Sequence, residues 1–288
     1  MAGLLVAAAV LAGGWVGYQR HPQQVQGART DAPLLADATP AAEVPLPSHP
    51  PAQKPQLPPP DQRERPAPGY EEGVASLGAA PSVPATSAEY SFSLTQTIPG
   101  GGSVPVTWSP CRPIHYVVDP TGAPSGFRGY VQLTTAEVQA ATGLVFIEDA
   151  ETMETPDVDR PPFQPSVYGD RWSPVLIRFA DESTVRELEG DVAGVAAPSR
   201  AHDLITGALH LVSGVVYLDT DILSSPDVRG APAYVPVLRH ELGHLVGLAH
   251  VSDETQLMYP TTTDVTTFQS GDVAGLAALG RGSCAPGL

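Results

Sequence analysis

Residues 240–250 constrain this chain more than any other stretch of its sequence. They read His-Glu-Leu-Gly-His-Leu-Val-Gly-Leu-Ala-His and match H-E-x-x-H-x-x-G-x-x-H at every fixed position. On a helix, His240 and His244 leave the same face one turn apart, which is the separation that two ligands of one tetrahedral zinc ion require. Gly247 can adopt positive φ and end that helix, so that His250 arrives from outside it as a third ligand. Three protein ligands leave the fourth position to water, as in catalytic zinc sites.

Glu241 lies next to the first of these histidines. It can reach a water at the metal without being a ligand, which suits a general base. Two simpler interpretations stay open: a helix whose surface histidines bind nothing, and an inactivated zinc site kept for structure. Deformylase-type hydrolases also use H-E-x-x-H, but they take a cysteine from an upstream strand as third ligand. Both cysteines of this chain lie far from the helix, which disfavours that class.

The residues after the motif carry a family resemblance. Met258 comes eight residues after His250, within Leu-Met-Tyr-Pro. Here the chain resembles the metzincin clan of zinc peptidases, and within it the matrixin-like branch, whose zinc motif is followed by a methionine-containing turn. The resemblance implies that Met258 forms a hydrophobic floor under the metal without binding it, and that Tyr259 and Pro260 line the S1' pocket. It spans roughly residues 105–282.

The same resemblance implies an activity and a fold. The activity is zinc-dependent endopeptidase cleavage of a protein or peptide, with Glu241 moving the proton. The fold is α+β, with a mixed twisted sheet, an active-site helix and a C-terminal helix. The rival from another class is a surface-displayed binding module that keeps the peptidase fold without catalysis. Which substrate is cleaved stays open.

Two further metal sites are weaker predictions. His202, Asp203 and His210 faintly resemble a structural zinc site of the family, although the long metal-binding loop of vertebrate matrixins is not recognisable. Calcium binding near Asp219 and Asp221 stays open.

Composition divides the chain into three parts. Residues 1–20 contain an apolar stretch that we interpret as a signal anchor or signal peptide. Residues 21–87 hold 15 of the 32 prolines and lack apolar periodicity, so we expect a disordered linker that, fully extended, reaches on the order of 200 Å. A spacer without function and a weak propeptide are the alternatives. Residues 88–288 form the expected peptidase domain, and the family's propeptide cysteine switch is absent.

Cysteine usage and charge bear on compartment and partners. Cys111 and Cys284 flank the domain, which favours a disulfide and an exported protein, secreted or anchored at the membrane by its N-terminal segment; two buried free thiols are the alternative.

The net charge is −16, which argues against nucleic-acid binding because that needs a basic face. We expect a monomer. Only one of 15 basic residues is lysine, which is typical of a GC-rich bacterial genome.

Hydrophobic periodicity gives the expected elements. Strands are predicted at 114–119, 144–147, 175–180, 209–212 and 215–218, helices at 127–142, 234–246 and 270–279, and an inserted loop at 149–168. Residues 114–119 would be the first strand, and Thr134 and Thr135 could break the first helix. By resemblance, residues 192–198 precede the edge strand of the sheet, and residues 209–212 are that edge, with which an extended substrate would pair.

Overall fold

The computed structural model describes residues 57–86, 88–98, 100–150, 152, 154 and 160–288. Residues 58–288 belong to one compact unit. The expected export segment at residues 1–20, and the expected linker up to residue 56, lie outside the described residues. Among the described residues, no helix combines the length and the apolar character needed to cross a membrane.

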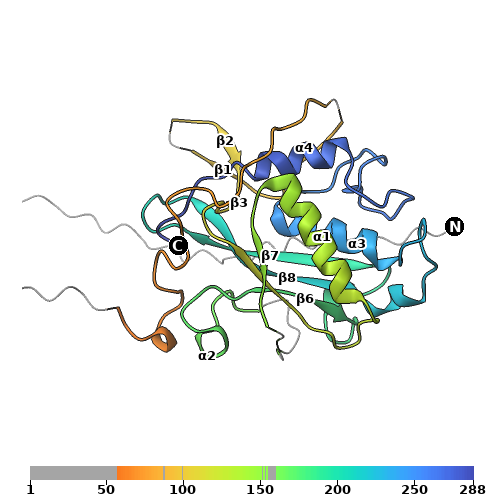
Figure 1. Cartoon of the computed structure of the whole chain (residues 1–288), viewed down its shortest axis with the longest axis horizontal. Helices are drawn as coiled ribbons and strands as arrows, with labels where there is room; N and C mark the ends of the chain where they lie inside the picture. The colour runs from red at the N-terminus through yellow and green to blue at the C-terminus, as the bar shows by residue number, and fades with distance from the viewer. Residues whose placement is uncertain (1–56, 87, 99, 151, 153, 155–159) are drawn as a thin grey trace, which may run out of the picture. The chain divides into compact units, whose positions relative to one another are not determined.

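One six-stranded sheet organises the domain (Figure 1). Strands β3 (Thr107–Trp108), β8 (Leu209–Asp219), β6 (Val175–Ala180), β4 (Ile114–Val118) and β5 (Phe146–Glu148) are parallel in that order, and β7 (Gly194–His202) pairs antiparallel with β8. A separate hairpin, β1 (Thr95–Thr97) and β2 (Ser103–Pro105), precedes them. The prediction that residues 114–119 form the first strand is therefore wrong.

The predicted pair of strands around Ser213 and Gly214 is a single strand. β8 continues through both residues and keeps its pairing with β7, apart from a register shift between Ser199 and Arg200. Gly214 is required where the helix that contains Leu245 crosses the sheet, because a Cβ at residue 214 would lie 2.9 Å from Leu245 Cδ1. The sequence pattern suggested a break between two strands at this glycine, whereas its role is close packing.

The edge strand was also misplaced. Residues 209–212 lie inside the sheet, with β7 on one side of β8 and β3 on the other. Residues 194–202, expected in part to precede the edge, form the edge strand β7 itself. Pro198 is compatible with that place, because proline lacks the N–H that a central strand must donate.

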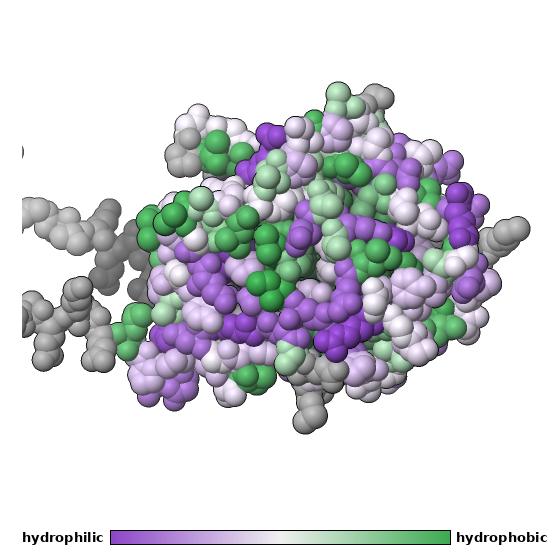
Figure 2. Space-filling view, viewed as in Figure 1, coloured by the Kyte–Doolittle hydropathy of each residue, from purple (hydrophilic) through white to green (hydrophobic). Residues whose placement is uncertain are grey.

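Three helices pack together beside the sheet: α1 (Phe127–Thr142), α3 (Tyr234–Val246) and α4 (Ser270–Leu279) (Figure 1). All three match the predicted ranges. α1 is unbroken, because the Thr134 and Thr135 hydroxyls donate to the carbonyls of Tyr130 and Val131 instead of competing for the helix. The main core lies between α1, α3 and the sheet. Figure 2 shows one face of the molecule, on which apolar residues form small patches among polar ones.

Shorter elements complete the domain. Among its described residues, the expected loop at 149–168 contains one helical turn, α2 (Pro165–Tyr168). Three 3-10 turns are η1 (Pro60–Gln62), η2 (Arg186–Leu188) and η3 (Thr220–Ser224). Leu188 of η2 joins a second apolar cluster, with Val117 of β4 and Leu176 of β6 among its members. Both faces of the central strands are thus buried, as a parallel sheet requires.

For residues 58–86 the expected disordered linker is wrong. Arg63 pairs with Asp170 at 2.7 Å, and Gly69 N–H donates to the carbonyl of Leu288 at 2.6 Å. Farther along, Leu77 N–H donates to Pro110 O at 2.9 Å. We call residues 58–86 and 88–93 the amino-terminal strap. In Figure 1 it begins, in orange, beside α2 and ends near α4.

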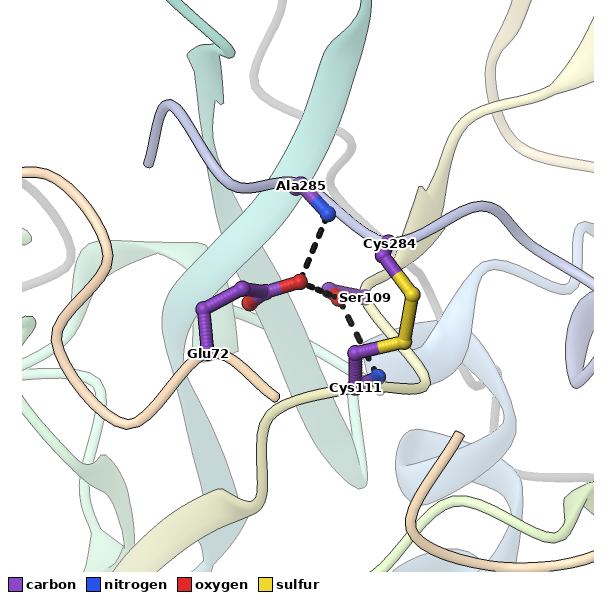
Figure 3. The surroundings of a disulfide bond; sticks show 5 residues. All are labelled: Glu72, Ser109, Cys111, Cys284 and Ala285. Carbon is purple, nitrogen blue, oxygen red and sulfur yellow. Dashed lines mark hydrogen bonds between the residues drawn. A yellow bond between two sulfur atoms is a disulfide. The ribbon is translucent and has the colours of Figure 1, made fainter. Parts of the chain in front are cut away.

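The expected disulfide between Cys111 and Cys284 is present, with its Cα atoms 5.2 Å apart. Glu72 of the strap lies beside it (Figure 3). The Glu72 carboxylate accepts hydrogen bonds from the Ser109 hydroxyl and, at 2.6 Å, from the Ala285 N–H. Strap, disulfide and C-terminal tail are therefore joined at one point.

Candidate metal centre

The structure brings His240, His244 and His250 together around one point. Their Nε2 atoms lie 2.9 Å (His240 to His244), 3.1 Å (His240 to His250) and 3.2 Å (His244 to His250) apart. Nitrogens bound at the usual distance to one tetrahedral zinc ion are about 3.3 Å apart. The three side chains thus fit such an ion.

The opposite ring nitrogens fix how the imidazoles are turned. His240 Nδ1–H donates to Leu257 O at 2.7 Å, and His244 Nδ1–H donates to Leu248 O at 2.8 Å. Burial lowers the pKa of His240 to about 3 and the pKa of His244 well below its usual value. Burial also lowers the pKa of His250. The rings are therefore neutral near pH 7, with the Nε2 lone pairs available to a metal.

Gly247 ends α3 as predicted. Its φ is 120°, and its N–H donates to Gly243 O and His244 O. A Cβ at this residue would lie 3.0 Å from Leu279 Cδ2. The chain can turn back here because glycine tolerates this backbone conformation, and the turn delivers His250 from outside the helix.

Glu241 is fully buried beside the histidines. Neither of its carboxylate oxygens bonds to another described side chain. Burial raises the pKa of this carboxyl well above its usual value, and the Ala196 backbone only partly opposes that effect. A buried acid without a charged partner is expensive in a purely structural role, but it suits a group that exchanges protons.

Gly194 of β7 lies at the site although no sequence motif predicted it there. A Cβ there would lie 3.0 Å from Glu241 Cγ and 3.2 Å from Glu241 Oε1. The edge strand therefore passes directly over the acid. A glycine inside an apolar run was the available signal, because it often marks a close approach of the backbone.

The turn containing Met258 lies under the histidines. Met258 is 1% exposed, and the adjacent Leu257 supplies the carbonyl that orients His240. Asp272 of α4 holds this turn, since its carboxylate accepts from Leu257 N–H at 2.8 Å and Met258 N–H at 3.2 Å. Asp272 was also missed; as part of a capping box with Gln269, it was visible only as a helix start.

A cavity of about 210 Å³ opens beside His240. Its lining is mainly apolar with a threonine run at one side, and it includes Ile222, Val228, Val237, Tyr259, Val265 and residues 261–263. Tyr259, which the resemblance implies for the S1' wall, is among the residues that line this cavity. Pro260 does not line this cavity, in contrast to the expected S1' wall.

The weaker zinc prediction fails on sheet geometry. Ala201 pairs with His210 and His202 pairs with Leu209, so the two histidines project from opposite faces of the sheet. The Asp203 carboxylate accepts backbone N–H groups of Ile205, Thr206 and Gly287 at 2.7 to 2.8 Å. These three residues form no ligand cluster among the described residues.

The calcium prediction likewise finds no support. Asp219 caps η3 by accepting the Asp221 N–H at 3.0 Å. Burial raises the pKa of Asp219, which disfavours the charged form that calcium would need. Apart from the three histidines, one group in the described part of the chain has its ligand atoms close together. It is Glu72 with Cys111 and Cys284, and both cysteines are used in the disulfide.

Comparison with known proteins agrees with this geometry. Residues 167–279 match a family model described as matrixin. The match runs from the end of α2 to the end of α4, so it contains β6, β7, β8, the three histidines and the Met258 turn. No curated protein matches the chain.

Proposed function

We propose that the chain is a zinc-dependent endopeptidase, because residues 167–279 match the matrixin family model. The observation that carries this proposal is the approach of three imidazole Nε2 atoms to within 3.2 Å of one another, next to a buried glutamate. His240, His244 and His250 would hold the metal. A structural site would be expected to add a fourth protein ligand, and no further His, Cys, Asp or Glu joins this cluster among the described residues.

Glu241 has the role of a proton carrier. Zinc, when bound, supplies Lewis acidity that polarises the scissile carbonyl and lowers the pKa of a water. The Glu241 carboxylate accepts a proton from the attacking water and delivers it to the departing amine. Its burial supports this role, because a raised pKa makes the carboxylate a stronger base toward the proton of the water.

The edge strand β7 offers a template for an extended peptide. It pairs with β8 on one side, and its other side has no strand partner among the described residues. A substrate aligned there as an added strand would pass Gly194 and Ala196, which lie next to Glu241. The cavity beside His240 would then take one apolar side chain of the substrate.

We also propose that the domain acts after export. The disulfide between Cys111 and Cys284 supports this, because disulfides persist in oxidising compartments. The apolar sequence at residues 1–20 supports the same destination.

The test compares the full chain with its Glu241→Gln variant on a mixed peptide library, with bound zinc measured in both. We expect one zinc in each protein, cleavage by the wild type, and at least a 1,000-fold (about 4 kcal/mol) lower rate for the variant. If both proteins hold zinc and neither cleaves any peptide, the peptidase proposal is wrong and the binding-module alternative replaces it.

A further inference from the structure

We propose that the end of the amino-terminal strap positions the third zinc ligand, with Glu89 and Ser93 as positioning residues. The inference rests on the proposed function, since it concerns the same metal centre. It assigns a role to a segment outside the family match, which begins only at residue 167.

His250 needs external support because it lies on a loop. It has no helical or strand hydrogen bonds of its own and is only half-buried, whereas His240 and His244 are buried within α3. A loop ligand must be held in place before the metal binds, or part of the binding free energy is lost to ordering it.

The strap pairs with this loop on the side that precedes His250. Phe92 forms an antiparallel bridge with Leu248. Ser93 N–H donates to Gly247 O at 2.9 Å, and Ala249 N–H donates to Ser91 O at 2.9 Å. The Ser93 hydroxyl adds a second bond to Gly247 O at 3.2 Å. The strap therefore acts as a short additional strand along residues 247–249.

A second anchor lies on the other side of His250. The Glu89 carboxylate accepts the Ser252 N–H at 3.0 Å and the Ser252 hydroxyl at 2.8 Å. His250 is thus flanked by strap contacts at Ala249 and at Ser252. Leu248 also accepts the Nδ1–H bond of His244, so that the same short ladder steadies the orientation of the second ligand.

The strap is fixed before it reaches the metal centre. Gly73 N–H donates to Cys111 O at 2.6 Å, and Thr86 bonds to Ser270 of α4 at 3.3 Å. At residues 78 and 143 the two backbones pass so closely that a Cβ on Gly78 would lie 2.3 Å from Gly143 O. Residues 88–93 are consequently delivered to the zinc loop by a segment that is itself held against the domain.

The strap braces the site and does not cover it. The cavity beside His240 is lined by residues of 222–265 only. A covering propeptide would release activity when removed, whereas loss of this segment should weaken metal binding. The described strap is therefore a part of the active enzyme and not a propeptide that is removed.

The test uses variants of the full chain and measures zinc affinity by chelator competition, together with the visible absorption spectrum of the cobalt(II)-substituted protein. Ser93→Pro removes the backbone N–H that bonds Gly247, while Ser93→Ala keeps it. We expect the zinc Kd to rise about 10-fold in Ser93→Pro, as for other groups that support metal ligands, with an altered cobalt spectrum. Ser93→Ala should remain within about 3-fold of wild type, because it loses one weak bond.

Variants of Glu89 give a second test, which perturbs the backbone less and does not depend on whether Ser93→Pro folds. Glu89→Ala should raise the zinc Kd about 5-fold, which is the equivalent of one hydrogen bond. Glu89→Gln keeps an acceptor oxygen, so it should retain most of the wild-type zinc affinity. Arg63→Ala is the matched control, since it loosens the strap at its far end, at Asp170. It should lower stability without changing the cobalt spectrum.

The outcomes separate the two proposals. If wild type binds zinc and Glu89→Ala matches it in affinity and cobalt spectrum, the brace is refuted while the peptidase proposal stands. An equal loss of zinc affinity in Arg63→Ala would also refute it, because general stability would then explain the effect. A wild type that binds no zinc overturns both.

Discussion

The Met258 thioether lies directly against Gly243, so that a Cβ on that glycine would be 2.7 Å from Met258 Sδ. Gly243 lies in the turn of α3 between His240 and His244. The methionine turn therefore touches the backbone of the ligand helix itself. This contact explains why residue 243 has no side chain.

Gly243→Ala should disturb the metal centre more than its size suggests. The added methyl would overlap Met258, with Phe268 at 3.4 Å limiting its escape. We expect a loss of about 1–3 kcal/mol in the free energy of unfolding, as for other overpacked cores, and a weaker zinc affinity. Gly129→Ala is the control, because nothing lies within 4 Å of its Cβ in α1; it should stabilise by about 0.5–1 kcal/mol. If Gly243→Ala and Gly129→Ala changed the free energy of unfolding in urea equally, the Met258 contact would be unimportant.

Arg239 should govern the shape of the cavity. Its guanidinium bonds the Glu137 carboxylate of α1 at 2.6 and 2.9 Å, and Thr266 O at 2.8 Å. Thr266 directly follows residues that line the cavity. Arg239→Met should raise KM for peptides with a large apolar side chain in that cavity, because the loop loses its anchor. Glu137→Gln keeps the loop bond, so it should mainly lower stability, by about 1 kcal/mol. A Glu137→Gln variant with the same KM increase would contradict the assigned role of the loop bond.

Removing the disulfide should cost stability more than activity. Cys111 and Cys284 are 173 residues apart in sequence, so their bond closes a very long loop in the unfolded chain. The chain-entropy model gives about 5 kcal/mol for such a loop. We expect the Cys111→Ser, Cys284→Ser double variant to unfold at a clearly lower urea concentration and to keep its zinc when folded, since neither residue contacts the three histidines. An unchanged unfolding midpoint would argue against this stabilising role.

His210 should make the domain less stable in mild acid. Burial lowers the pKa of His210, against the opposing charges of Asp203 and Glu72. In the unfolded chain its pKa is near 6.5, so below that pH the unfolded state binds the extra proton and stability falls until the folded pKa is reached. Between pH 7 and 5.5, wild type should therefore lose more stability than His210→Gln in urea unfolding. The zinc ligands titrate in both proteins and cancel in this comparison; parallel pH profiles would exclude His210 as the cause.

Short-range patterns predicted the local geometry that brings the three histidines together. The four-residue spacing of His240 and His244 and the turn at Gly247 depend on helix geometry alone, and α3 has the predicted bounds of Tyr234 and Val246. The apolar run at Val175–Ala180 likewise forms β6 as expected. Such features are encoded within a few consecutive residues, where one periodicity dominates.

Composition led to a wrong prediction for the strap, which was expected to be disordered. Its prolines suggested an extended chain without partners, but a proline-rich segment still offers carbonyls and the N–H groups of its other residues. Gly73 and Leu77 use theirs to bond Cys111 and Pro110. No local pattern encodes these bonds, because each partner lies more than 30 residues away.

The sequence by itself determined which side chains gather at the candidate site, and the tertiary structure decided what supports them. Motif spacing identified the three histidines and Glu241, since a helix turns a fixed spacing into a fixed geometry. Strand register alone put His202 and His210 on opposite faces of the sheet, and packing alone set Gly194 over Glu241, Met258 against Gly243 and Asp272 under the methionine turn. These relationships join residues distant in the chain, so they exist only once the fold brings their backbones together.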